Sequence, residues 1–303
     1  MVSMPSLQCR LLDACIICYS IQNGRIDPSV PFYNNVGFKP GTTPTVFVDG
    51  PEAINAGFVG ETADDWVIVA YRGTIPPFTG KFWSWVTDWL NDFRIGPAPW
   101  KVGGKVIGKV ETGFGFAVIN TWAAVSGALA KIDLSQKKGI LVTGHSKGGG
   151  MTFPSATLIK NAYPHVPVQN CSFAAPLTCD QTFADSYKNM GLDPFTARYQ
   201  NQYDIVPFLP YYPHFSILAA AERRSNNGVN EAITPENWPS EAENDYVRIG
   251  KLRYLGDGCK VETGAQGQDD ADSDLWHALE HLQFKEIAEA HAASGRYHTC
   301  VCG

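Results

Sequence analysis

The stretch Gly139-Ile-Leu-Val-Thr-Gly-His-Ser-Lys-Gly-Gly-Gly150 predicts the centre of the fold. Its first five residues are mostly apolar, which is typical of a strand that is buried on both faces of a parallel sheet. They lead into the pattern G-x-S-x-G at residues 144–148, and a helix is expected from there to about Ala162. The flanking glycines allow a sharp turn, so the Ser146 hydroxyl is expected at the carboxyl end of the sheet, where open α/β folds bind ligands. Ser146 is therefore a candidate nucleophile.

A glycine-rich turn before a helix has an alternative interpretation as an anion-binding loop. The phosphate-binding pattern G-x-x-x-x-G-K-[ST] does not match the spacing around Lys147. The direct passage from a buried strand through Ser146 into a helix therefore favours the nucleophile.

The flanking sequence alternates between strand and helix patterns. Strands are expected at residues 44–49, 55–60, 66–72, 166–174, 195–200 and 246–255, and helices at residues 5–21, 114–132 and 272–293. This alternation indicates an α/β fold with a mostly parallel central sheet and helices on both faces. We expect one domain over residues 1–303, with a polar surface insertion at residues 225–244.

The composition narrows the class of protein. The chain has 303 residues, 44% of them hydrophobic, and a net charge of −6. It contains no basic stripe and no apolar run long enough for a transmembrane helix, which argues against nucleic-acid binding and membrane spanning. Gln8, Arg10 and Asp13 interrupt the pattern of a signal peptide, so we expect a cytoplasmic protein or one whose signal has been removed.

Eight cysteines are many for a cytosolic enzyme, and five of them lie near the two ends of the chain. A disulfide between the N-terminal helix and the C-terminal tail would form in an oxidising compartment. Buried free thiols are the alternative. The Cys15–Cys18 pair lacks a matching second pair, so the zinc-ribbon spacing is absent from the sequence.

A serine nucleophile needs a histidine base and an acid that orients the base. Asp204 directly follows the strand expected at 195–200, and Asp180 and Asp193 are alternatives because each flanks a strand. In folds with this type of turn, the histidine follows the acid in the chain. The histidines after Asp204 are His214, His277, His281, His291 and His298. His291 lies at the end of the last long helix, a position that favours it, but the residues alone leave the choice open.

Two backbone N–H groups are needed to stabilise an oxyanion. One belongs to the residue after the serine, which is Lys147. Thr74 follows the strand at 66–72 and is the candidate for the second, although an ordinary turn at the strand end is an equal alternative.

Taken together, these motifs resemble the class 3 lipases, the fungal triacylglycerol lipase type of the α/β-hydrolase fold. The resemblance extends from about residue 40 to the C-terminus, and it rests on Val69–Thr74, Val142–Gly149, Ala175-Pro176, Asp204–Pro207 and the segment from Ala290 to Cys302. It implies a serine ester hydrolase with Ser146, Asp204 and His291 as the catalytic triad and with Thr74 and Lys147 as oxyanion donors. It also implies that Cys302 pairs with an N-terminal cysteine, and that the enzyme needs no cofactor or metal.

The chain departs from the family pattern at several positions. Lys147 stands where the family usually has leucine, and Glu111 stands where it has histidine. The gap between Asp204 and His291 is also longer than in the fungal enzymes. These differences indicate a divergent member.

Lipases of this family carry a lid after the oxyanion loop, and residues 75–100 are the matching segment. Its aromatic side chains include Phe82, Trp83, Trp85 and Trp89, which we assign to substrate binding. Part of the segment follows helical spacing, which fits a lid at a lipid–water interface but also a core helix. The expected partner is a lipid or another ester.

Three other functions compete with lipase activity. The first is an esterase for feruloyl, phospholipid or short-chain esters, which would use the same mechanism. The second is a binding protein without activity. The third is a zinc enzyme, indicated by the pattern H-x-x-E-H at His277–His281, although only 22 residues follow it and Glu286 and Glu289 are expected on the same helix, where they cannot fold back as a third ligand.

Overall fold

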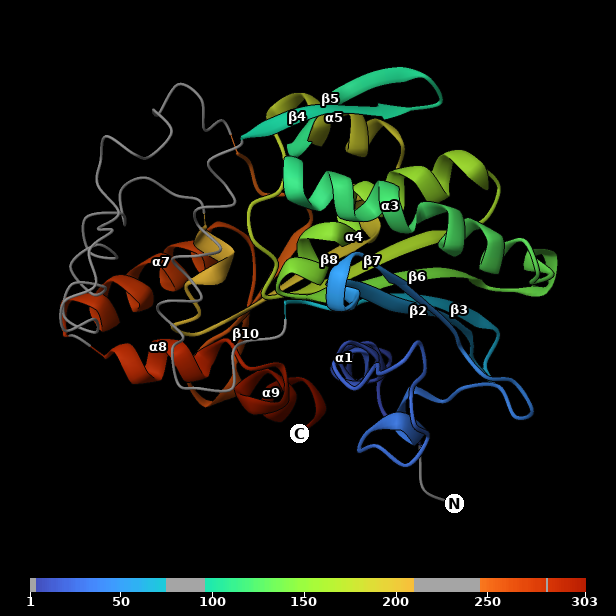
Figure 1. The fold of residues 1–303 in the computed structure, drawn as a ribbon. Coiled ribbons are helices and arrows are strands. Elements are labelled where there is room, and N and C mark those ends of the chain that lie inside the picture. Colours follow the sequence, from blue (N-terminus) through green and yellow to red (C-terminus); the bar gives the residue numbers. More distant parts are fainter. Residues whose placement is uncertain (1–3, 75–95, 210–245, 282) are drawn as a thin grey trace.

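The strand Gly139–His145 (β6) lies in the middle of the central sheet of the computed structural model, which describes residues 4–74, 96–209, 246–281 and 283–303. Within these residues, eight strands form the sheet in the order β1-β2-β3-β6-β7-β8-β9-β10 (Figure 1). The other seven strands are β1 (Thr45–Asp49), β2 (Asn55–Glu61), β3 (Trp66–Tyr71), β7 (Val168–Phe173), β8 (Thr196–Asn201), β9 (Lys251–Leu255) and β10 (Val261–Glu262). The expected insertion at 225–244 lies outside the described residues.

The five central strands, from β3 through β9, are parallel to one another. The antiparallel strands β1, β2 and β10 extend the sheet at its two edges. All seven residues of β6 and five of the six residues of β3 are buried, as expected for strands that are covered on both faces. The prediction of a mostly parallel sheet is confirmed.

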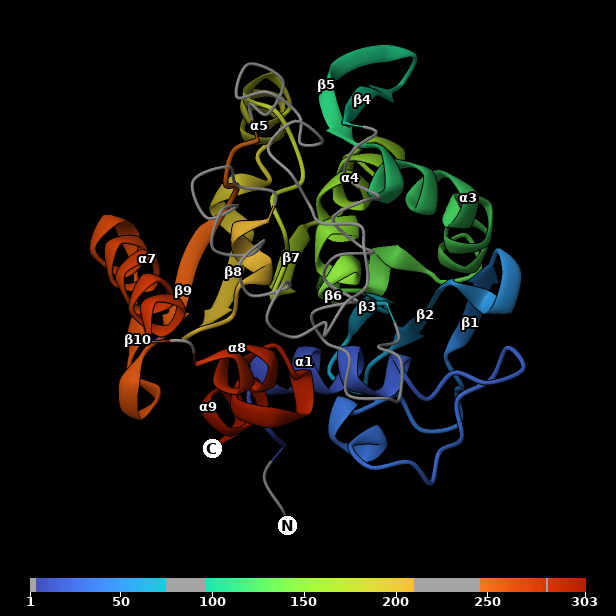
Figure 2. The same ribbon diagram turned by 60° about the vertical axis from the view of Figure 1, so that its left-hand side comes forward.

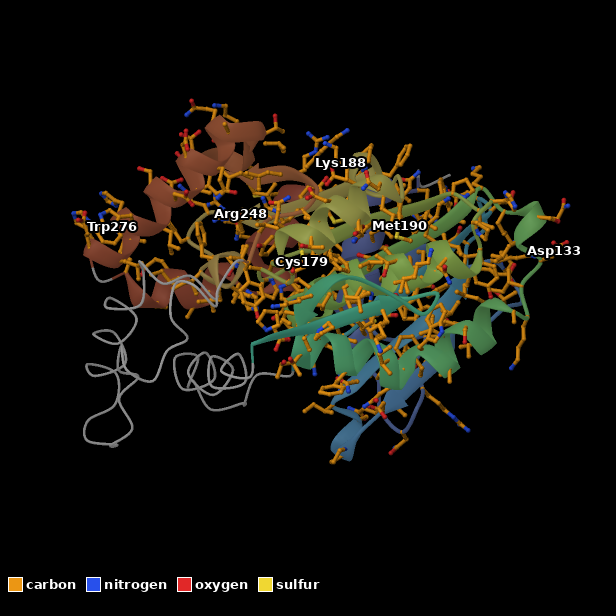
Figure 3. The ribbon with its side chains drawn as sticks, turned by 90° about the horizontal axis from the view of Figure 1, so that it is seen from above. Asp133, Cys179, Lys188, Met190, Arg248 and Trp276 are labelled. Carbon is orange, nitrogen blue, oxygen red and sulfur yellow. A yellow bond between two sulfur atoms is a disulfide. The ribbon has the colours of Figure 1, made fainter. Side chains whose placement is uncertain are left out.

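Helices cover both faces of the sheet (Figure 1). One face carries α3 (Thr112–Leu129), α4 (Lys147–Ala162) and α5 (Gln181–Asn189), and α7 (Gly264–Glu280) packs against β9. The other face carries α1 (Leu7–Cys18) and α9 (His298–Cys302), which contact each other. A separate hydrophobic core fills each face. Viewed from above, Trp276 on α7 and Asp133 after α3 lie at opposite ends of the molecule (Figure 3).

One covering helix also has the length and apolar composition needed to cross a membrane. In the described part of the chain, α3 is the one such helix. Half of its 18 residues are buried, and it packs against α4 and the sheet. This packing accounts for its apolar composition as that of a core helix.

A hairpin of β4 (Pro97–Val102) and β5 (Lys105–Glu111) was not expected from the sequence. Gly103 and Gly104, both with positive φ, form its two-residue turn. The hairpin corrects the lid assignment of residues 96–100, because Trp100 is a buried core residue whose indole N–H donates to Thr157 Oγ1 at 3.0 Å. The rest of the proposed lid, with Phe82, Trp83, Trp85 and Trp89, lies outside the described residues.

The single helix expected at 272–293 was wrong. The structure has α7 and a separate helix α8 (Phe284–Ala290), with His281 in a non-helical conformation between them. A continuous helix would place Ile287 about 12 Å beyond Leu279 along its axis. The break allows both side chains to pack in the same core. The end of α8 contacts residues 293–297, which pack against α1 and lead into α9 (Figure 2).

Two disulfides fasten the C-terminal helix. Cys9–Cys302 joins α9 to α1, and Cys259–Cys300 joins α9 to the turn after β9. The expected link between the two ends of the chain is therefore confirmed. The buried thiols of the alternative interpretation are also present, at Cys15, Cys18, Cys171 and Cys179.

Replacing Trp100 with alanine is expected to lower the free energy of unfolding by about 3–5 kcal/mol, because it leaves a cavity and removes the hydrogen bond from the indole N–H to Thr157 Oγ1. Urea unfolding monitored by circular dichroism measures this change. Phe116→Ala is the matched control, because Phe116 is 64% exposed on α3 and its loss should change stability by less than about 0.5 kcal/mol. Equal effects of the two substitutions would contradict the assignment of Trp100 to the core.

Candidate active site

Ser146 occupies the turn between β6 and α4, in a conformation that is rare for a residue with a side chain. Its φ is 58° and its ψ is −129°. Backbone hydrogen bonds hold this conformation, because Ser146 N donates to Phe173 O at 3.0 Å and Gly150 N donates to Ser146 O at 3.1 Å. Backbone strain of this kind persists only where the surrounding structure enforces it, and it is found mainly at functional sites.

The glycines of the G-x-S-x-G pattern allow the backbones around the turn to approach closely. A Cβ atom on Gly144 would lie 2.1 Å from Gly148 O, and a Cβ atom on Gly148 would lie 2.3 Å from Tyr71 O. Neither position has room for a side chain. The spacing of the pattern is thus required for β3, β6 and α4 to pack around Ser146.

A chain of hydrogen bonds links Ser146, His291 and Asp204. Ser146 Oγ lies 2.9 Å from His291 Nε2, and His291 Nδ1 lies 3.0 and 3.1 Å from the two carboxylate oxygens of Asp204. All three residues are buried. They come from three elements, because Ser146 follows β6, Asp204 follows β8 and His291 caps the C-terminus of α8. This arrangement allows the imidazole to accept the proton of the hydroxyl while the carboxylate orients the ring.

The carboxylate of Asp204 accepts two further hydrogen bonds. Val206 N donates to Oδ1 at 3.0 Å, and the Tyr297 hydroxyl donates to Oδ2 at 2.7 Å. Burial, together with the negative charge of Asp204, raises the pKa of Tyr297 well above its ordinary value, so the phenol remains a donor. Asn201 N in turn donates to the Tyr297 hydroxyl. These contacts fix the carboxylate in the orientation that faces His291.

His145 supports the backbone of His291. Its Nε2 lies 2.8 Å from His291 O, and its Nδ1 lies 2.9 Å from the Tyr19 hydroxyl on the chain just after α1. Burial, and then repulsion from His291, lowers the pKa of His145 well below its ordinary value of 6.5. The neutral ring therefore donates from Nε2 to the His291 carbonyl and accepts at Nδ1 from Tyr19.

The sequence did not indicate a role for Tyr19 or His145. It also did not predict that Tyr297 contacts Asp204. His145 occupies a variable position of G-x-S-x-G, which carries no signal for its role. Tyr19 is 126 residues away from His145 in the chain, so the contact depends on how α1 packs on the sheet. Tyr297 entered the resemblance only as an aromatic residue after the histidine.

The candidate oxyanion donors lie on both sides of Ser146. A Cβ atom on Gly73 would be 3.1 Å from Ser146 Cβ, so the loop that leads to Thr74 runs beside the serine. Lys147 is the first residue of α4, where backbone N–H groups are not used by the helix. Its side chain donates to Asn55 Oδ1 on β2 at 2.7 Å. This contact accounts for a lysine where the resemblance predicts leucine.

Glu111 stands where the family has histidine, and it caps α3. Its carboxylate accepts hydrogen bonds from Gly113 N at 2.9 Å and Phe114 N at 2.7 Å. A buried acidic cap at a helix N-terminus is favoured by the helix dipole. The departure from the family pattern is therefore compatible with the local structure.

The other candidate acids have local roles. Asp180 caps α5 by accepting from Phe183 N at 2.8 Å, and Asp193 accepts from Gly250 N at 2.9 Å. His291 Nδ1 contacts Asp204 instead, so neither Asp180 nor Asp193 is the acid partner of His291.

Three of the other candidate histidines also lie elsewhere. His277 and His281 stack on each other, and His298 contacts Asp13. His214 lies outside the described residues. Within the described part of the chain, the single group of potential metal ligands comprises Cys9, Asp13, His298 and Cys302, so His277-x-x-Glu280-His281 forms no such group.

A sheet of this strand order, with a serine in a strained turn at the exit of its central parallel strand, is the architecture of the α/β-hydrolases. Solved structures with this fold include a triacylglycerol lipase from Penicillium expansum, with 15% identity, coverage of 88% of this chain and 86% of that chain, and a TM-score of 0.60. Lipase II from Rhizopus niveus has 18% identity, the same two coverages and the same TM-score. The Rhizomucor miehei lipase–propeptide complex has 15% identity, covers 88% of this chain and 74% of that chain, and has a TM-score of 0.61.

The sequence itself matches the family Lipase (class 3) over residues 68–213, which include the turn at Ser146 and Asp204. This match and the shared fold support the assignment of the chain to the class 3 lipase family and to the carboxylic ester hydrolases. No curated protein matches it.

The neutral state of His145 is expected to make stability depend on pH. In the unfolded chain His145 binds a proton near its ordinary pKa of 6.5, whereas in the folded protein its pKa lies well below this value. The unfolded state therefore takes up more protons as the pH falls, and the free energy of unfolding decreases. Between about pH 7.5 and 5.5, this one group should remove ~1.4 kcal/mol of stability.

Urea unfolding of the wild type and of His145→Gln at these two pH values measures the effect. The variant is expected to be less stable than the wild type at both pH values. Between pH 7.5 and 5.5, however, its free energy of unfolding should fall by ~1.4 kcal/mol less than that of the wild type. A pH dependence that is the same in both proteins would show that His145 takes up its proton in the folded state.

Proposed function

We propose that this enzyme is a lipase that cleaves acylglycerol esters through an acyl-enzyme on Ser146. The observation that carries the proposal is the hydrogen-bonded chain Ser146–His291–Asp204 at the strained turn. Its support comes from the family match and from relatives whose names describe triacylglycerol lipases.

In the first half of the reaction, His291 Nε2 removes the Ser146 hydroxyl proton as Oγ attacks the ester carbonyl carbon. Asp204 stabilises the imidazolium, and Tyr297 and Val206 keep the carboxylate oriented. The N–H groups of Thr74 and Lys147 stabilise the oxyanion of the tetrahedral intermediate. The imidazolium then protonates the leaving alcohol as the carbon–oxygen bond breaks.

Water releases the acyl group in the second half. His291 removes a proton from water, the hydroxide attacks the acyl carbon, and a second oxyanion forms in the same position. Its collapse breaks the bond to Ser146 Oγ, which regains its proton from His291. The products are an alcohol and a fatty acid.

We further propose that residues 1–303 form one catalytic domain and that residues 75–95 contact the lipid surface. The sheet combines strands from Thr45 to Glu262, and a disulfide connects Cys9 with Cys302, which supports a single unit. The lipid contact is supported by sequence alone, through Phe82, Trp83, Trp85 and Trp89, since tryptophan favours membrane interfaces.

The Ser146→Ala variant is expected to lower the rate of fatty acid release from a triacylglycerol emulsion by about four orders of magnitude or more, because it removes the nucleophile. Titration of released acid at constant pH measures the rate. Ser126→Ala is the matched control, because Ser126 is a partly exposed serine on α3 whose hydroxyl donates to the local backbone at Ala123 O, and the variant should retain full activity.

A soluble short-chain p-nitrophenyl ester provides the second substrate. If the wild type cleaves this ester but releases no acid from the emulsion, the enzyme is an esterase of another substrate class and the lipase proposal fails. If Ser146→Ala keeps wild-type rates on both substrates while folded by circular dichroism, the proposed nucleophile is wrong.

A further inference from the structure

A second group of reactive side chains lies between α1 and α9, on the opposite face of the sheet from α4 (Figure 1). Helix α1 contributes Cys9 and Asp13, and helix α9 contributes His298 and Cys302. The members of each pair are four residues apart, so they lie one helical turn apart on the same side of their helix. Two facing helices thus bring four potential metal ligands together.

The distances within this group are short. Its four ligand atoms all lie within 4.8 Å of one another. Asp13 Oδ1 is 3.0 Å from His298 Nε2, and Asp13 Oδ2 is 3.6 Å from Cys9 Sγ. The sulfur atoms of Cys9 and Cys302 form a disulfide in this structure. Asp13 is completely buried, and the Asn35 side chain also hydrogen-bonds to its carboxylate.

The ligand types favour zinc over harder cations. Two thiolates, an imidazole and a carboxylate suit a tetrahedral Zn²⁺ site, whereas Mg²⁺ and Ca²⁺ prefer oxygen ligands alone. Tetrahedral coordination with Zn–S bonds of about 2.3 Å requires sulfur atoms about 3.8 Å apart. The disulfide must therefore open before a metal binds, while the other ligands already lie near their required separations.

We propose that Cys9, Asp13, His298 and Cys302 bind one Zn²⁺ ion when the Cys9–Cys302 disulfide is reduced by a dithiol. The dithiol supplies two electrons and two protons, the sulfur–sulfur bond breaks to give two thiols, and the dithiol becomes a disulfide. Binding of Zn²⁺ then releases the two thiol protons to solvent. His298 coordinates as a neutral imidazole through Nε2, which exchanges its contact with Asp13 for the metal.

The site has a structural consequence for the enzyme. Helix α9 directly follows Tyr297, which donates to Asp204, so a link between α9 and α1 restrains the segment that carries Tyr297. The Cys9–Cys302 disulfide links the two helices under oxidising conditions, and the bound Zn²⁺ ion links them under reducing conditions. The nearby Cys259–Cys300 disulfide belongs to no group of metal ligands among the described residues, which makes it a matched control.

The test uses the full chain with Cys259→Ser and Cys300→Ser, reduced with a phosphine under argon and freed of reductant. Titration with Co²⁺ is expected to give the thiolate-to-cobalt charge-transfer band and the intense visible bands of a tetrahedral site. Elemental analysis after exchange with Zn²⁺ should find one ion per chain. The same protein with its disulfide intact should bind none.

His298→Ala in the same background keeps both cysteines and should bind Zn²⁺ at least tenfold more weakly. Equal affinity in this variant, or no metal in the reduced parent protein, overturns the proposal. If the double-serine protein does not fold, the reduced wild type is alkylated with and without Zn²⁺ and mapped by mass spectrometry. Protection of Cys9 and Cys302 with modification of Cys259 and Cys300 is expected, and any other pattern overturns the proposal.

Discussion

The close approach of three backbone segments at the turn 144–148 is the constraint on which the rest of the structure depends. Gly144 and Gly148 leave no space for a side chain against α4 and β3, and between them Ser146 has a positive φ of 58°. The energetic cost of such a conformation is of order 1–3 kcal/mol, and it is offset by the burial of β6 and its neighbours. The strained turn is thus held by strands that are buried on both faces, which keeps the hydroxyl in a fixed place.

The remaining parts of the site reach this hydroxyl from the second half of the chain. Asp204 is positioned by the end of β8, but His291 depends on the break between α7 and α8 and on contacts to its backbone from His145. Tyr297 and Tyr19 extend these contacts to the C-terminal helix and the N-terminal helix, respectively. The helices α1 and α9, which the Cys9–Cys302 disulfide joins, lie below the sheet in Figure 1 and are linked to the site through these two tyrosines.

The features predicted from the sequence are those with a local physical signal. A continuous apolar run predicted β6, the glycine spacing predicted the turn, and a strand end followed by a proline-rich loop indicated Asp204. The choice of His291 among five histidines needed the family resemblance, because its position depends on tertiary packing. Tyr19 and His145 were missed altogether, because their contact also depends on tertiary packing. The hairpin of β4 and β5 was not predicted, although Gly103-Gly104 is a recognised turn signal. The aromatic residues of this segment favoured a lid instead.

The central claim is that the turn presents Ser146 as a nucleophile activated by His291. Mass spectrometric mapping after reaction with an alkyl fluorophosphonate tests it most directly, because the reagent bonds covalently to activated serine hydroxyls. The account predicts one adduct per chain, on Ser146, and a labelling rate that falls by orders of magnitude in a folded His291→Ala variant. Labelling of a different serine, or labelling of Ser146 at the same rate without His291, would contradict it.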